Sequence, residues 1–121
     1  MPGYEAELNE TVRAIIGPDI LIETLSHDIA LEVDFDAPIV DAMKSALLAH
    51  DPEGIPVPYL MSGGTDNKAL SEIGIVGYGF SPLRLPTDLD FMSLFHGVDE
   101  RAPIDGIRFG VRVLADFLEH A

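Results

Sequence analysis

The stretch VPYLMSGGTDNKALSEIGIVGYGF, residues 57–80, decides the fold expected from this sequence. Residues 57–61 form a short apolar run, and residues 73–80 form a second one that glycines interrupt. Glycine within such a run permits the close approach of another backbone. Between the two runs, residues 67–72 are expected to form a short helix. We expect both apolar runs to be strands, and the order strand, helix, strand predicts a parallel βαβ unit.

The segments before this stretch extend the prediction of an α/β fold. Residues 4–16 place apolar side chains at helical spacing and are followed by Gly17 and Pro18, so they predict a helix. Residues 20–33 are rich in β-branched and apolar side chains, which predicts one long strand or two strands and a turn. Residues 36–50 predict a second helix, with Asp36 as N-cap and Pro38 in the first turn.

The segments after it are a long loop and a final helix. Residues 81–103 contain three prolines and no clear period, and loops of about twenty residues in compact domains are usually functional or disordered. Residues 105–120 predict a helix. One face of this helix carries the apolar side chains of Ile107, Val111, Leu114, Phe117 and Leu118, and another carries Arg108 and Arg112.

Composition bounds the class of protein. The 121 residues fit one compact domain, and 47% hydrophobic residues are enough for an ordinary core. With 21 acidic and 7 basic side chains, the formal charge of −14 argues against nucleic acid and against anionic membrane surfaces. The absence of cysteine leaves His, Asp and Glu as metal ligands. No secretory signal is readable, so we expect a cytoplasmic protein.

The turn SGGTD, residues 62–66, is the first candidate site. It follows an expected strand and opens an expected helix, where glycines let the backbone turn sharply and free amides point outward. Such a turn can hold an anion. Thr65 and Asp66 would also cap the helix without any ligand, so both interpretations stay open.

The second candidate is His96, in the motif FHGVDER at residues 95–101. Neutral imidazole is a common zinc ligand. Asp99 or Glu100 could accept the second ring N–H and orient the imidazole for a metal. The alternative is a histidine that fastens the loop to the core.

The remaining histidines and the loop cations have ordinary explanations. His50 and His120 lie near the C-termini of expected helices, where positive charge is favourable, and His27 lies in a strand connection. Arg84 and Arg101 could each hold a substrate carboxylate, although pairing with a neighbouring aspartate is more frequent.

Three motifs in order resemble the C-terminal part of a family of two-zinc amidohydrolases and exopeptidases, which includes aminoacylase, succinyl-diaminopimelate desuccinylase, carnosinase-like dipeptidases and glutamate carboxypeptidases. The motifs are MSGGTD at 61–66, GIVGYGFSP at 74–82 and FHGVDER at 95–101, followed by the final helix. The resemblance implies that residues 1–35 are the remnant of a lid or dimerisation domain, a helix plus a strand. Residues 36–121 would then be the C-terminal segment of the catalytic domain, with βαβ topology.

The resemblance also implies roles for particular residues. His96 would bind one of two zinc ions, and Gly63, Gly64 and Thr65 would contact the substrate, a small peptide or an N-acyl amino acid. Arg84 or Arg101 could favour a free carboxylate, as expected of an exopeptidase or an N-acyl amino acid hydrolase. In an intact enzyme of this family, a zinc-bound water attacks an amide carbonyl while an upstream glutamate moves the proton.

The chain departs from the family pattern in one large respect. It contains neither the His-x-Asp pair nor the Glu-Glu pair of the upstream motifs, and so resembles an excised C-terminal fragment. We therefore expect the chain alone to be inactive and to bind zinc weakly. We also expect self-association through apolar surfaces, for which exchange of the lid strand is one route. The competing interpretations are a small anion-binding module and an assembly domain without catalysis.

Overall fold

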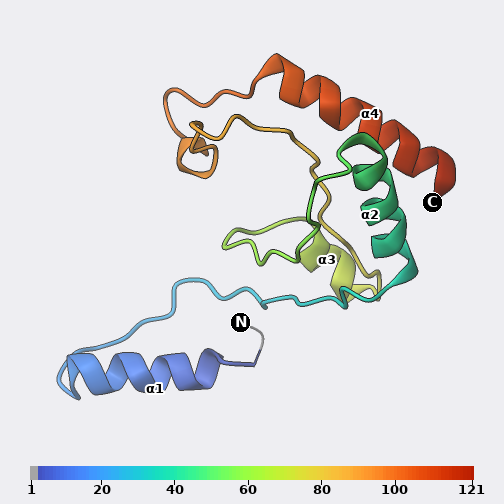
Figure 1. Cartoon of the computed structure of the whole chain (residues 1–121). Coiled ribbons are helices and arrows are strands. Elements are labelled where there is room, and N and C mark those ends of the chain that lie inside the picture. Colours follow the sequence, from blue (N-terminus) through green and yellow to red (C-terminus); the bar gives the residue numbers. More distant parts are fainter. Residues whose placement is uncertain (1–2) are drawn as a thin grey trace. The chain divides into compact units, whose positions relative to one another are not determined.

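The computed structural model describes residues 3–121 as helices joined by irregular segments (Figure 1). The elements are α1 (Glu5–Ile16), α2 (Pro38–His50), α3 (Asn67–Glu72), the short 3₁₀ helix η1 (Met92–Leu94) and α4 (Ile104–His120). The four helices predicted from the sequence are thereby confirmed.

The predicted α/β fold is wrong. Within residues 3–121 the structure has no strand, and segments 20–33, 57–61 and 73–80 are irregular backbone (Figure 1). A strand is stable only when a neighbouring strand accepts and donates its backbone hydrogen bonds. Apolar and β-branched composition favours such pairing but does not supply the partner. Neither the βαβ unit at residues 57–80 nor the lid strand at residues 20–33 forms.

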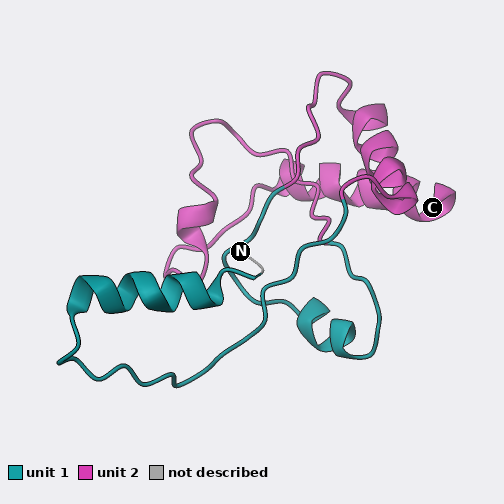
Figure 2. Ribbon diagram, turned by 90° about the horizontal axis from the view of Figure 1, so that it is seen from below, with its two compact units in different colours: residues 1–34, 59–78 teal, residues 35–58, 79–121 magenta. Residues whose placement is uncertain are grey.

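The chain divides into two compact units (Figure 2). Unit 1 comprises the chain up to Asp34 together with Tyr59–Tyr78, and contains α1 and α3. Unit 2 comprises Phe35–Pro58 and Gly79–Ala121, and contains α2 and α4. Met1 and Pro2, which we assigned to the lid remnant, lie outside the described residues.

The core of unit 2 lies between α2 and α4. Its buried residues are Ala46, Phe109 and Val113, and Leu47, Phe80 and Phe117 pack against them. The Val113 side chain is fully buried. The Phe80 and Phe117 rings meet edge to face with centroids 5.6 Å apart, a favourable aromatic geometry. This cluster joins the segment after residue 79 to the two helices.

Two glycines one turn apart bring the loop backbone against α4. A Cβ atom on Gly110 would lie 2.4 Å from the carbonyl oxygen of Pro82, and one on Gly106 would lie 2.9 Å from the carbonyl oxygen of Arg84. Both distances are shorter than a carbon–oxygen contact allows. Gly106 and Gly110 therefore form a groove that only glycine permits, and this groove fixes the position of the backbone at residues 82–84.

The buried face of α4 is not the face that the sequence pattern emphasised. The helix buries Gly106, Phe109, Gly110 and Val113. Of the apolar side chains that the sequence places together, Phe117 packs on the core, whereas Ile107, Val111, Leu114 and Leu118 are exposed. Because the glycines contribute no hydrophobic signal, apolar periodicity alone does not identify the face that packs.

One carboxylate links the C-terminal ends of α2 and α4. Asp116 lies 3.4 Å from His50 Nε2 through one oxygen and 3.0 Å from His120 Nδ1 through the other. The backbone carbonyl of Asp116, 2.8 Å from the same His120 nitrogen, is the main cause of a raised His120 pKa, and the carboxylate adds to it. Both histidines lie where the helix dipole favours positive charge, as expected from the sequence.

We expect the pKa of His120 to be higher in the folded chain than in the unfolded chain. A raised folded pKa means that the stabilisation is fully present below the unfolded value of about 6.5 and is lost as the pH rises through the folded value. Titration of the His120 ring by NMR, in buffer and in urea, measures both values. Asp116→Asn should lower the folded value, and equal midpoints in the two states would contradict the prediction.

In unit 1, α1 ends at Gly17, which has φ 84° and donates its N–H to the Arg13 carbonyl. Helix α1 has no buried residue, and Leu8 is 63% exposed. Near α3, Lys68 lies 3.8 Å from Asp28. Helix α1 therefore adds no buried side chain to the described part of the unit.

Helix α3 ends in a Schellman motif. Ile75 donates its N–H to the Leu70 carbonyl, Gly74 donates to the Ser71 carbonyl, and Gly74 has φ 80°. This turn uses the backbone of residues 73–75, part of the second strand expected from the sequence. The glycines of this run were expected to permit close approach of another backbone, but the crowded one, Gly77, faces a side chain, since a Cβ there would lie 2.2 Å from the Asn67 side chain.

The predicted caps differ in detail. Ala37 is the N-cap of α2, in place of Asp36, and Pro38 occupies the first turn as expected. Asp66 is the N-cap of α3 but makes no capping bond with its side chain.

Among the described residues, no helix is both long enough and apolar enough to cross a membrane.

Candidate functional site

The loop that carries His96 is a compact turn in unit 2. Asp90 holds its start, accepting hydrogen bonds from the backbone and hydroxyl of Ser93. After η1, Gly97 donates its N–H to the Leu94 carbonyl at 3.0 Å. The rings of Phe91 and Phe95 meet edge to face at 5.1 Å. These contacts are local, so the turn forms from its own residues.

His96 adopts a left-handed backbone conformation with φ 59°, which no other non-glycine residue among those described shares. Left-handed backbone costs a non-glycine residue roughly 1–3 kcal/mol and persists only where the surroundings hold it. Here the Glu100 carboxylate accepts the backbone N–H of His96 at 3.1 Å. Such backbone strain concentrates at functional sites.

The carboxylates expected to orient the imidazole have other partners. Glu100 contacts the backbone of His96 rather than its ring. Asp99 is paired with the Arg101 guanidinium, which also donates to the Asp99 carbonyl at 3.0 Å. Within residues 3–121, the structure shows no hydrogen bond to the His96 ring. The exposed imidazole is therefore free to bind a ligand, but nothing in the loop fixes its rotation.

The described residues do not assemble a complete zinc site in this structure. Three or more protein ligands from fixed positions are the usual requirement. Among the residues that the structure describes, no group of three or more His, Asp or Glu side chains is placed to hold a metal ion. His50, Asp116 and His120 lie together, but as an ion-paired link between helices.

A shallow hollow of about 320 Å³ lies beside this loop. Its lining residues are Pro86, Asp88, Leu89, Arg101, Ala102 and Pro103. Arg101 is the cation in this lining. It pairs with Asp99, and pairing with a neighbouring aspartate is the role that we considered more frequent for the loop arginines. Arg84 is exposed and makes no ion pair with any described residue, while its backbone is fixed by the glycine groove of α4.

The glycine turn belongs to the other unit. Gly63, Gly64 and Thr65 are exposed in unit 1, and nothing lies within 4 Å of a Cβ built on Gly64. The Thr65 carbonyl accepts the N–H of Lys68 at 3.1 Å, which makes the turn the entry to α3. His96 and Arg84 belong to unit 2, so the predicted substrate-binding residues and the predicted metal ligand are divided between the units.

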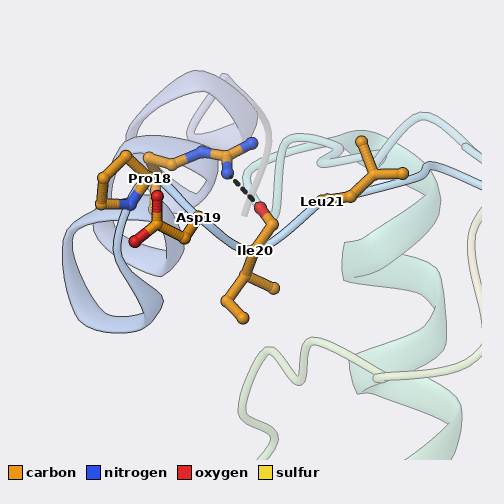
Figure 3. Close-up of a pocket in the computed structure, with 5 residues that line it drawn as sticks. Pro18, Asp19, Ile20 and Leu21 are labelled. Carbon is orange, nitrogen blue, oxygen red and sulfur yellow. Dashed lines mark hydrogen bonds between the residues drawn. The ribbon is translucent and has the colours of Figure 1, made fainter.

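A second hollow, of about 450 Å³, was not expected from the sequence. It lies in unit 1 at the turn after α1 and is lined by Arg13, Pro18, Asp19, Ile20 and Leu21 (Figure 3). The Arg13 guanidinium donates a hydrogen bond to the Ile20 carbonyl across it (Figure 3). The sequence signal for this feature was the Gly17-Pro18 break. This hydrogen bond ties the arginine to the turn.

Comparison with known proteins gave no match to a family model, to a curated protein or to a solved structure. The evidence that bears on function is therefore the three sequence motifs MSGGTD, GIVGYGFSP and FHGVDER, and the geometry of the His96 loop.

Proposed function

We propose that this chain is part of a zinc-dependent hydrolase of the two-zinc amidohydrolase and exopeptidase class, to which it contributes His96 as a metal ligand. The observation that carries the proposal is the strained His96 backbone within the motif FHGVDER, held by the Glu100 carboxylate. Left-handed backbone is uncommon for a non-glycine residue, and strained residues of this kind cluster at functional sites.

The substrate of this class is a small molecule with an amide or peptide bond. By the resemblance, Gly63, Gly64 and Thr65 would contact the substrate, and all three residues are exposed. Arg84, which has an exposed guanidinium and a fixed backbone, pairs with a free carboxylate of a peptide or N-acyl amino acid. The general base and the remaining metal ligands are not among the residues of this chain, so the chain alone should not hydrolyse amides.

Zinc titration of the pure chain should show weak binding that depends on His96. We expect His96→Ala to weaken zinc affinity on the order of tenfold, because it removes the exposed imidazole of the loop. Isothermal titration gives the affinity, and NMR of the ring protons identifies the histidine that responds. His27→Ala, which removes another exposed imidazole, is the matched control and should leave the affinity unchanged.

Two results would contradict the proposal. The first is NMR shifts on zinc addition that are confined to the rings of His50 and His120, with unchanged zinc affinity in His96→Ala. Zinc would then bind at Asp116 and its two histidine partners instead. Amide hydrolysis by the pure chain that a chelator abolishes would show that the base and the other ligands are present after all.

The competing assembly role is favoured by a separate observation, the number of large apolar side chains left exposed in both units. Exposed contiguous apolar surface marks interaction sites more often than chance. This assembly role does not exclude the hydrolase role, because a segment of a hydrolase also presents exposed apolar surface.

A further inference from the structure

Helix α4 carries a second apolar face that no other described residue of unit 2 covers. Its members are Ile104, Ile107, Val111, Leu114 and Leu118, which we call the α4 stripe, and they are 67%, 47%, 61%, 38% and 74% exposed. Their spacing alternates between three and four residues along the 17-residue helix. This is the a/d pattern of a helix that packs on another helix.

The stripe is distinct from the surface that packs on α2. At about 100° per residue, the stripe lies roughly 120° around the helix from the face of Gly106, Phe109, Gly110 and Val113. The remaining third of the circumference carries the charged side chains Asp105, Arg108, Arg112, Asp116 and Glu119. Within unit 2, helix α4 therefore has one face for its own core, one charged face, and one apolar face without a partner.

We infer that the α4 stripe pairs with the α4 stripe of a second copy of this chain in antiparallel orientation. A seam with a/d spacing is self-complementary, since Val111 of one copy lies level with Leu114 of the other and Ile107 with Leu118. Knobs-into-holes packing of these five side chains covers a continuous apolar seam along a helix about 25 Å long.

The charges beside the stripe select the antiparallel orientation. Arg108, in the first half of α4, borders the stripe on its charged side, and Glu119 lies on the same side at the far end. In this antiparallel register, Arg108 lies level with residue 117 of the second copy, about 3 Å along the helix axis from Glu119. The symmetry of the pair makes this contact twice. A parallel pair would set each Arg108 at the level of the other, without an acidic neighbour from the second helix.

The first test is the mass of the chain in solution. At about 100 μM, light scattering should give a mass twice the 13.1 kDa of one chain. The double substitution Val111→Glu with Leu114→Glu should weaken self-association by about a hundredfold or more, because it places charge where apolar side chains meet. Leu8→Glu introduces the same charge at an exposed leucine of α1 and should leave the dimer intact.

The second test is a charge exchange. Arg108→Glu or Glu119→Arg alone should weaken the dimer by roughly five- to tenfold, and the two together should restore it to within about twofold. Arg112→Glu, which lies about 40° further around the helix from the stripe than Arg108 does, is the control and should have less effect than Arg108→Glu. A monomeric wild-type chain, a dimer that survives the double substitution in the stripe, or a combined variant as weak as either single one would overturn the inference.

Discussion

Phe109→Ala is expected to unfold unit 2 in most molecules. Removal of a buried phenylalanine side chain costs about 3–5 kcal/mol through lost apolar burial and the cavity left behind. Phe109 is 5% exposed and belongs to a cluster with few other buried members, Ala46 and Val113. A core this small rarely supplies more than about 3–5 kcal/mol of stability, so we expect the substitution to remove nearly all of it.

Hydrogen exchange of the α2 and α4 amides measures this effect without interference from unit 1. Protection of both helices should fall together, because α4 packs on α2 through the same cluster. Phe95→Ala is the matched control, since Phe95 is 43% exposed and lies outside the cluster. It should change protection in α4 little. Normal exchange in Phe109→Ala would show that the helices are not held by this core.

Gly110→Ala is expected to destabilise unit 2 by roughly 2 kcal/mol, although alanine is the better helix former by about 1 kcal/mol. The new methyl group would lie 2.4 Å from the Pro82 carbonyl oxygen, and a backbone atom cannot move aside as a flexible side chain does. Either the segment at residues 82–84 leaves the groove or α4 moves away from it. Both responses separate Phe80 from Phe117.

Gly79→Ala provides the comparison within the same unit. Nothing lies within 4 Å of a Cβ built on Gly79, and its backbone is not left-handed, so alanine there should be neutral or stabilising by less than about 1 kcal/mol. Denaturant unfolding of the two variants, followed by circular dichroism, gives the difference directly. A Gly110→Ala chain more stable than the wild type would mean that helix propensity outweighs the contact.

The helices were predictable because their signals are local. Helical spacing of apolar residues, Gly17-Pro18 after α1 and Pro38 in the first turn of α2 each act within a few residues. The expected strands failed for the opposite reason, since pairing is decided by distant segments. Residues 73–75 show the competition clearly, because the Schellman turn at Gly74 uses backbone groups that a strand would have needed.

The candidate site was predictable in part. The sequence singled out His96 and placed Glu100 beside it, but the left-handed backbone and the contact from Glu100 to the backbone follow from the turn after η1. The sequence also allowed Arg101 two partners, and the structure pairs it with Asp99. These outcomes depend on distances of a few tenths of an ångström, which residue types alone do not fix.

The sequence by itself determined which segments are helical, the acidic surface, and the chemistry available to the His96 loop. The tertiary structure alone decided which face of α4 is buried. Gly106 and Gly110 carry no hydrophobic signal, yet the absence of side chains lets the backbone at residues 82–84 approach α4 and turns Phe109 and Val113 toward α2. Close packing selects this face through shape, which left the more obvious apolar stripe of α4 exposed.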